Sequence, residues 1–181
     1  MLEYIEFLII VPTYNSYKDL KEFTSSIKSQ SHQKWRTIFV DGDSSKEHKD
    51  WLKYCSDLDN RFIVIDELKN SRGIYPSMSL GAQYAQENEW VIFFGSDDWF
   101  SSSESLSQIS LCIGNYKRYN TKLVICGSQF ISKKTNQILR VNKLPSLSFL
   151  DNQKLAKLIY FGFMPAHQSL CFSSDLLKNI M

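Results

Sequence analysis

The apolar positions of this chain fall into short continuous runs, separated by segments in which apolar residues recur with a helical period. Continuous runs of four or five apolar residues are typical of strands buried on both faces of a parallel sheet. The predicted strands are residues 7–11, 37–40, 62–65 and 90–94. Two later segments, 123–126 and 137–139, predict further strands that form either a hairpin or an extension of the sheet.

Helical spacing of apolar residues follows these runs, which predicts helices around residues 20–27, 47–55, 78–87 and 106–113. Three residue pairs just after predicted strands have capping-box spacing, in which side chains satisfy the unpaired N–H groups of a helix start. The pairs are Ser16 with Asp19, Ser44 with Glu47, and Ser101 with Glu104. Alternating strands and helices predict an α/β fold with a mostly parallel sheet and right-handed crossovers.

Three polar loops follow the predicted strands, at residues 13–15, 41–44 and 96–98. Loops that follow parallel strands leave the sheet at the same edge, so we expect these three to converge on one crevice. In open α/β sheets, ligands bind at that edge.

The most informative of these loops holds two adjacent carboxylates, Asp97 and Asp98, directly after a buried strand and a glycine. Adjacent carboxylates repel each other unless a positive charge lies nearby. A divalent cation that carries a diphosphate is a natural partner, because hard cations take oxygen ligands. The alternative is a solvated acidic turn that caps the next helix.

Length and composition predict a single packed domain, since the chain has 181 residues, of which 43% are hydrophobic and 14% are aromatic. No apolar run is long enough to cross a bilayer, and the acidic N-terminus lacks the basic start of a secretory signal. The four widely spaced cysteines favour free thiols in a reducing compartment over a zinc site or disulfides. We therefore expect a cytoplasmic protein.

Charge is distributed unevenly along the chain. Residues 1–117 carry 12 basic and 17 acidic side chains, whereas residues 118–181 carry 9 basic and 2 acidic ones. This asymmetry favours either an ordinary solvated surface or peripheral contact with an anionic partner, such as a lipid phosphate at the inner face of the membrane. Nucleic acid is not a predicted partner, because the basic residues are scattered and no recognition motif accompanies them.

The predicted crevice lacks two common nucleotide-binding signatures. No Gly-x-Gly-x-x-Gly follows the first strand, and the chain has no glycine-rich phosphate loop with a lysine. A nicotinamide-dependent dehydrogenase and a phosphate-loop enzyme are therefore both disfavoured. Phosphates would have to be held through a metal, which a nucleoside-diphosphate sugar allows.

Four segments of this sequence resemble inverting family-two glycosyltransferases with the GT-A fold. They are residues 11–15 (VPTYN), 40–45 (VDGDSS), 73–81 (GIYPSMSLG) and 94–98 (FGSDD), and the resemblance continues loosely to 166–170 (AHQSL). It implies an α/β GT-A fold, with a mostly parallel sheet flanked by helices, as a single domain over residues 1–181. Residues 1–100 would form the nucleotide-sugar-binding half, and 101–181 the start of the acceptor-binding half.

The resemblance also implies roles for individual residues. Asp41 would accept a hydrogen bond from the nucleotide base, and Asp97 would face the ribose or the diphosphate. Asp98 would bind Mg²⁺ or Mn²⁺, which stabilises the charge of the leaving diphosphate. The other residues assigned to donor binding are Pro12, Thr13, Tyr14, Asn15, Asp43, Arg72, Gly73 and His167. His32 and His48 have polar sequence neighbours, and we expect both at the surface.

The sequence departs from this family at several positions. Pro76 and Ser79 stand where an acidic residue and an asparagine are usual, and Ser71 stands where an acidic residue is frequent. The resemblance places the general base of an inverting transferase beyond Met181, so no catalytic base is assigned and C-terminal truncation is expected. Asp175 is interpreted as a residue of the first turn of a helix.

The predicted function is transfer of a sugar from a nucleoside-diphosphate sugar to a glycan or lipid-linked acceptor. Because the expected base is missing, the alternative is a non-catalytic module that binds nucleotide-sugars. A sugar-nucleotide pyrophosphorylase is a weaker alternative, because Pro12-Thr13-Tyr14-Asn15 is not the glycine-rich basic loop of that class.

Overall fold

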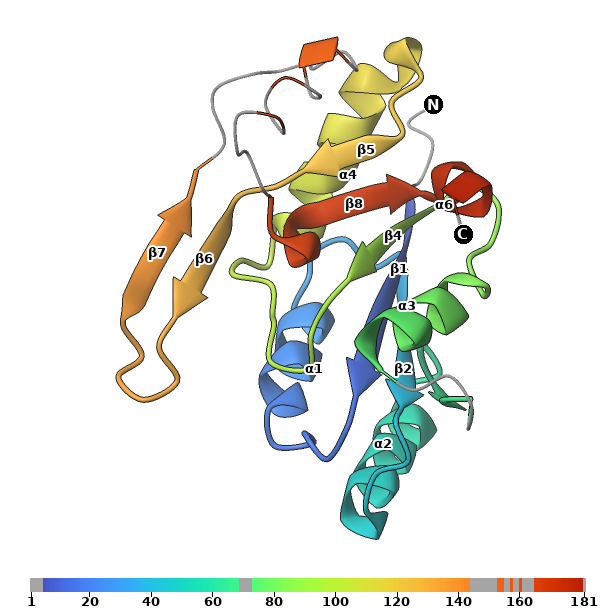
Figure 1. The fold of residues 1–181 in the computed structure, drawn as a ribbon, viewed down its shortest axis with the longest axis vertical. Helices are drawn as coiled ribbons and strands as arrows, with labels where there is room; N and C mark the ends of the chain where they lie inside the picture. Colours follow the sequence, from blue (N-terminus) through green and yellow to red (C-terminus); the bar gives the residue numbers. More distant parts are fainter. Residues whose placement is uncertain are drawn as a thin grey trace.

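The four continuous apolar runs form adjacent parallel strands in a computed structural model, which describes residues 5–68, 73–143, 153–154, 157, 160 and 165–180. The strands of the main sheet are β1 (Glu6–Thr13), β2 (Trp35–Asp41), β3 (Phe62–Asp66), β4 (Glu89–Phe93), β5 (Leu123–Ile125) and β8 (Leu170–Ser173). Their order is β3-β2-β1-β4-β8-β5 (Figure 1). β1 to β4 pair in parallel, and β8 pairs antiparallel with both β4 and β5. The predicted α/β fold with a mostly parallel sheet is confirmed.

Helices cover both faces of this sheet. α1 (Leu20–Lys28), α2 (Lys46–Leu58) and α4 (Ser105–Tyr116) pack on one face, and α3 (Ile74–Ala82) and α6 (Ser174–Ile180) pack on the other (Figure 1). Alternate side chains of β1 enter the two cores, with Phe7 and Ile9 in the first and Leu8 and Ile10 in the second. Burial on both faces explains why β1 shows as an uninterrupted apolar run. Two short 3₁₀ turns are η1 (Lys117–Tyr119) and η2 (His167–Ser169).

A second, two-stranded sheet is formed by β6 (Ser128–Ile131) and β7 (Ile138–Asn142), an antiparallel hairpin that stands apart from the main sheet (Figure 1). The expected extension of the sheet by residues 123–126 is confirmed by β5. A hairpin between that strand and residues 137–139 is not formed, because β6 lies between them in sequence and takes β7 as its partner. β8 was not predicted, since its four residues carry no distinctive pattern.

All three predicted capping boxes are wrong. The helices begin after Asp19, Ser45 and Glu104, and none of these residues caps its helix with a side-chain hydrogen bond. The Ser16 hydroxyl instead bonds to the Thr13 hydroxyl at the end of β1, and the Ser44 hydroxyl accepts from the Asn15 N–H in the loop that follows. Short polar side chains serve loops as readily as helix starts, so capping-box spacing alone does not distinguish the two. α3 also begins four residues earlier than expected, at Ile74.

The four cysteines are free thiols, as the sequence predicts. Burial raises the pKa of Cys126 to about 11 and that of Cys171 well above its usual value, so both thiols stay protonated at neutral pH. Among the residues that the structure describes, no helix is both long and apolar enough to span a bilayer.

Candidate functional site

The loops that follow β1, β2 and β4 lie at one edge of the sheet, as predicted. β1 is the shared neighbour, because its Thr13 stands in register with Asp41 of β2, and its Ile10 with Phe93 of β4. All three strands run parallel and end at this edge. Two groups of polar side chains result, one around Asp41 and one around Asp98.

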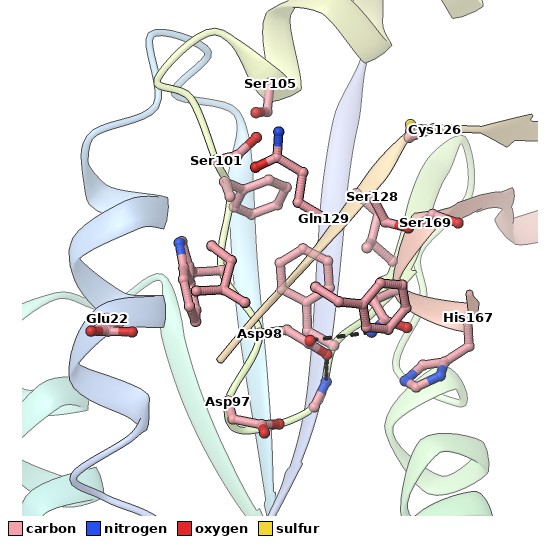
Figure 2. Close-up of a pocket in the computed structure, with 18 of the residues that line it drawn as sticks. Glu22, Asp97, Asp98, Ser101, Ser105, Cys126, Ser128, Gln129, His167 and Ser169 are labelled. Atoms are coloured by element: carbon pink, nitrogen blue, oxygen red, sulfur yellow. Dashed lines mark hydrogen bonds between the residues drawn. The ribbon is translucent and has the colours of Figure 1, made fainter. Parts of the chain in front are cut away.

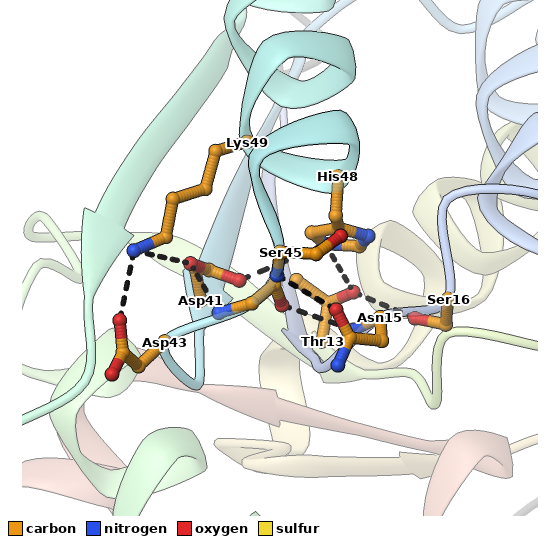
Figure 3. Close-up of polar contacts among 9 residues, drawn as sticks. Thr13, Asn15, Ser16, Asp41, Asp43, Ser45, His48 and Lys49 are labelled. Atoms are coloured by element: carbon orange, nitrogen blue, oxygen red, sulfur yellow. Dashed lines mark hydrogen bonds and ion pairs between the residues drawn. The ribbon is translucent and has the colours of Figure 1, made fainter.

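The first group is a network that joins the loop after β1 to the start of α2 (Figure 3). The Thr13 hydroxyl lies 2.8 Å from the Ser16 hydroxyl. The Asn15 backbone N–H donates to the Ser44 hydroxyl at 3.0 Å, and the Asn15 carboxamide oxygen accepts from the Ser45 N–H at 2.7 Å. Asn15 has a φ of 50°, a left-handed conformation that asparagine tolerates well. This network, the Asp41 cluster, comprises Thr13, Asn15, Ser16, Asp41, Asp43, Ser44, Ser45, His48 and Lys49.

Asp41 is the buried acid of this cluster, with only 1% of its surface exposed. Its Oδ2 accepts a hydrogen bond from the Ser44 N–H at 3.2 Å and lies 3.9 Å from Lys49 Nζ. Its Oδ1 has no hydrogen-bond partner among the described residues, although His48 Nε2 lies 3.7 Å away. An unsatisfied buried carboxylate oxygen is costly, and Oδ1 therefore retains an unused acceptor position.

His48 is fully buried, so the expectation of a surface histidine is wrong. It shares the inner face of α2 with Leu52 and Cys55, and its Nε2 lies 3.1 Å from the Thr13 hydroxyl. Burial lowers the pKa of His48, and the nearby charge of Asp41 opposes that shift only in part. A neutral imidazole therefore supports the cluster at neutral pH. His32 is half-buried, with Nε2 2.8 Å from the Ile5 carbonyl oxygen.

The second group lines a cavity of about 860 Å³ at the same edge (Figure 2). Its walls come from α1, the loop after β4, the start of α4, β6 with the turn that follows it, and η2. Asp97, Asp98 and His167, all assigned to the site from the sequence, line this cavity. Asp19 and Glu22 of the α1 wall add two carboxylates that the sequence analysis did not assign to the site.

Asp98 is held in place by neighbours on two sides. Its Oδ2 accepts a hydrogen bond from the Gly95 N–H at 2.6 Å, and its Oδ1 accepts one from Gln168 Nε2 at 3.3 Å (Figure 2). Burial raises the pKa of Asp98, and the negative charge of Asp97 adds to that rise. The Gly95 N–H, His167 and Gln168 act in the opposite direction without cancelling it. Ionisation of Asp98 is therefore disfavoured in its described surroundings.

These residues fit a divalent cation. A Cβ on Gly95 would lie 3.0 Å from Asp98 Oδ2 and 3.1 Å from Asp97 Oδ1, so a larger residue at this position would crowd both carboxylates. No group of three or more histidine, cysteine or acidic side chains among the described residues is arranged to hold a metal. A cation here would take its remaining ligands from phosphate and water, which is how Mg²⁺ is usually bound.

The other residues assigned from the sequence are placed as follows. Pro12 is buried within β1, which continues through it, whereas Tyr14 is 66% exposed beside the Asp41 cluster. Gly73 precedes α3 with a φ of 123°, and its N–H donates to Glu67 Oε1 at 2.6 Å. Arg72 lies outside the described residues.

Besides His48, Asp19 and Glu22, the sequence analysis missed three further contributors. Gln168 bonds Asp98, and Glu67 binds both Gly73 and the Ser77 hydroxyl at the start of α3. Lys133, in the turn between β6 and β7, has its Nζ 3.3 Å from Asp97 Oδ2. Gln168 lies within a segment that the resemblance covers, but Lys133 carries no local signal, because only the fold brings that turn to the cavity.

A family model described as glycosyl transferase family 2 matches residues 8–175. The chain belongs to glycosyl transferase family 2. The match covers the Asp41 cluster and the whole cavity, from the loop after β1 to η2.

Curated relatives of this family-2 chain include the PGL/p-HBAD biosynthesis glycosyltransferase of Mycobacterium bovis. It is 29% identical over 112 residues, which cover 61% of this chain and 43% of that protein. Escherichia coli WfgD, named a UDP-Glc:alpha-D-GlcNAc-diphosphoundecaprenol beta-1,3-glucosyltransferase, is 24% identical over 182 residues. That match covers 94% of this chain and 70% of WfgD.

The fold matches solved glycosyltransferase structures. The mannosyltransferase PcManGT from Pyrobaculum calidifontis, in complex with GDP-Man and Mn²⁺, superposes with a TM-score of 0.66 at 15% identity. This match covers 97% of the family-2 chain and 46% of PcManGT. The GT-A fold expected from the sequence is thus confirmed, and the chain spans less than half the length of this structure and of the mycobacterial relative.

Proposed function

We propose that this chain binds a nucleoside-diphosphate sugar with a divalent cation, and that it serves glycosyl transfer to a glycan or a lipid-linked acceptor. The observation that carries the proposal is the pairing of two acidic groups at one edge of the sheet. Asp41 offers an unsatisfied buried acceptor, and Asp98 is a largely buried carboxylate that forms no ion pair with a described residue. A nucleotide base and a metal-bound diphosphate match these two groups. Because the chain belongs to glycosyl transferase family 2, we favour glycosyl transfer over a pyrophosphorylase reaction.

In this proposal Asp98 holds Mg²⁺ or Mn²⁺, and Asp97 faces the ribose or the diphosphate. The cation supplies Lewis-acid stabilisation of the departing diphosphate when it is bound. PcManGT, which shares the fold, is solved with Mn²⁺ and a nucleotide-sugar, and this supports the choice of ligands. Asp41 accepts an N–H of the base, with Thr13, Asn15 and the exposed Tyr14 beside it.

We further propose an inverting reaction, whose general base lies outside the described residues. Glu104 is engaged by the Ser31 hydroxyl at 2.8 Å, and Asp175 pairs with Lys122 Nζ at 2.6 Å. Asp175 belongs to α6, as expected, and neither carboxylate lines the cavity. We therefore assign the base to neither residue.

Calorimetric titration with UDP and GDP, each with and without Mn²⁺, tests this function directly. We expect one of the two nucleotides to bind with a strong dependence on Mn²⁺, because the protein's own ligands to the cation are few. Absence of binding by both nucleotides at millimolar concentration would contradict the proposal. A turnover assay with the matching sugar donor then separates an active transferase from a non-catalytic binding module.

We also propose peripheral contact with an anionic membrane surface. The β6–β7 hairpin exposes apolar residues, of which Leu139 is 69% and Ile138 56% exposed, next to exposed Lys134, Arg140 and Lys143. Basic and apolar side chains together suit anionic lipid headgroups. The name of the relative WfgD includes a substrate linked to diphosphoundecaprenol, which supports a lipid-linked acceptor.

Sedimentation with vesicles tests this contact. We expect binding to vesicles rich in phosphatidylglycerol at low salt, with loss of about 1 kcal/mol of binding energy per basic residue replaced. Binding should fall when Arg140 and Lys143 are changed to glutamine, and it should weaken at high salt. Equal sedimentation with neutral vesicles, or no salt dependence, would exclude an electrostatic contact.

A further inference from the structure

Lys133 is the residue whose position is least explained by the proposed function. It lies in the turn between β6 and β7, and its ammonium group reaches two carboxylates that are distant in sequence. Its Nζ lies 3.3 Å from Asp97 Oδ2, in the loop after β4, and 3.3 Å from Asp19 Oδ1, at the start of α1. One side chain thus connects the hairpin to the start of α1 and to the loop after β4, which holds the proposed metal site.

The turn that carries Lys133 is well defined. The Ser132 N–H donates to the Gln137 carbonyl oxygen at 2.9 Å, and the Asn136 N–H donates to the Ser132 carbonyl oxygen at 2.8 Å. Asn136 adopts a left-handed conformation, with a φ of 53°, which closes the turn. These bonds fix the backbone from which Lys133 extends toward the cavity that it lines.

The hairpin has no other polar tie to the rest of the described chain. Every hydrogen bond of residues 128–142 with described partners lies within the hairpin. The ion pairs that connect the hairpin to other described residues are both made by Lys133. The neighbouring Lys134 carries the same charge in the same turn and forms no ion pair with a described residue. The two lysines differ in the contacts of their ammonium groups.

We infer that Lys133 acts as a resident counter-cation, which neutralises Asp97 and holds the hairpin as a wall of the cavity until a divalent cation displaces it. This inference rests on the proposed metal site at Asp98. Asp97 and Asp98 are adjacent, so a divalent cation there places a second positive charge beside the Lys133 ammonium group. Like charges that share neighbouring carboxylates repel. Binding of the cation and the two ion pairs of Lys133 therefore weaken each other.

Linkage makes the effect reciprocal. If Lys133 weakens cation binding by some factor, the bound cation weakens the attachment of the hairpin by the same factor. Lys133 is 59% exposed, so we expect a modest factor of about two to five, the range for exposed ion pairs. The function of the device is to couple donor loading to opening of the cavity wall formed by the hairpin.

The test measures binding of Mn²⁺ alone, from the electron-spin-resonance signal of free Mn²⁺, in Lys133→Met and in the matched control Lys134→Met. We expect Lys133→Met to bind Mn²⁺ about two- to five-fold more tightly than the wild type. Lys134→Met should leave the affinity unchanged, and Lys133→Arg, which restores the charge, should return it toward the wild-type value. A second measurement, which does not depend on metal affinity, is the rate of amide hydrogen exchange in peptides that cover residues 128–142. Their exchange should accelerate in Lys133→Met, and in the wild type on addition of Mn²⁺.

Three outcomes would overturn this inference. Unchanged or weaker Mn²⁺ binding by Lys133→Met, while binding still depends on Asp98, would show that Lys133 does not compete with the cation. Weaker binding of UDP with Mn²⁺ by Lys133→Met would instead assign Lys133 to the diphosphate. Mn²⁺ binding that is unaffected by Asp98→Asn would remove the proposed metal site itself, and the inference would fail together with it.

Discussion

Replacing Asp98 with asparagine is expected to abolish Mn²⁺-dependent nucleotide binding and, at the same time, to stabilise the metal-free protein at neutral pH. Asparagine keeps the size of the side chain, and its carboxamide oxygen can still accept the Gly95 N–H. Gln168 can turn its own carboxamide to accept from the new NH₂ group. The substitution therefore removes the charge and retains the contacts, so we expect at least a hundred-fold loss, about 3 kcal/mol, of metal-dependent affinity.

The gain in stability follows from the pKa of Asp98, which burial and the charge of Asp97 raise in the folded state. The folded protein then holds a proton at pH values where the unfolded chain has lost it, so stability falls as the pH rises through that window. Above the folded pKa, ionised Asp98 remains a cost that asparagine never carries. We expect Asp98→Asn to gain about 0.5–2 kcal/mol at pH 7 in EDTA, and to lose this advantage as the pH falls below about 4.

Thermal denaturation across pH, with EDTA or with Mn²⁺, measures both effects. Mn²⁺ should raise the melting temperature of the wild type and leave that of Asp98→Asn unchanged. Asp175→Asn is the control, since the hydrogen bond from Lys122 and the charge of that residue hold the pKa of Asp175 below its usual value, and this carboxylate lies outside the cavity. It should bind nucleotide normally and gain no stability. A metal-free Asp98→Asn protein less stable than the wild type at pH 7 would mean that the carboxylate is needed for structure.

The parallel half of this fold is predictable from sequence for a simple reason. Strands β1 to β4 lie between helical layers, so nearly every position of such a strand is apolar, and the resulting run is visible without any alignment. The convergence of the loops around Asp41 and Asp98 then follows from topology alone, because parallel strands all end at the same edge. The carboxyl-terminal third is less regular, and its β8 strand has only four residues.

The site residues that sequence reasoning missed were missed for two different reasons. His48 was visible in principle, because it recurs with Leu52 and Cys55 at helical spacing, which marks the buried face of α2. Polar sequence neighbours hid that face. Lys133 and Gln168 could not have been found in this way, because their partners are set by how late segments fold over the cavity. Such contacts are tertiary and leave no period in the sequence.

Asp41→Asn is expected to weaken nucleotide binding about ten- to hundred-fold, with Mn²⁺ binding at Asp98 unaffected. A hydrogen bond to a charged acceptor contributes about 1.5–3 kcal/mol, and the Oδ1 atom of Asp41 has no described partner that would compete for it. Asparagine can keep the Ser44 N–H bond with its single oxygen, but it then turns an NH₂ group toward the base. The asparagine NH₂ group would then face an N–H of the base, so the loss of affinity should exceed that caused by a missing hydrogen bond.

Comparing the loss of affinity among different ligands shows which part of the nucleotide Asp41 contacts. If Asp41 accepts from the base, Asp41→Asn must weaken binding of UDP or GDP, yet leave binding of ribose 5-phosphate or pyrophosphate with Mn²⁺ unchanged. Asp66→Asn is the matched control, because Asp66 is the exposed register partner of Asp41 at the end of β3. It should bind all of these ligands as the wild type does. If Asp41→Asn lost the same affinity for nucleotide and for pyrophosphate, Asp41 would stabilise the loop and would not contact the base.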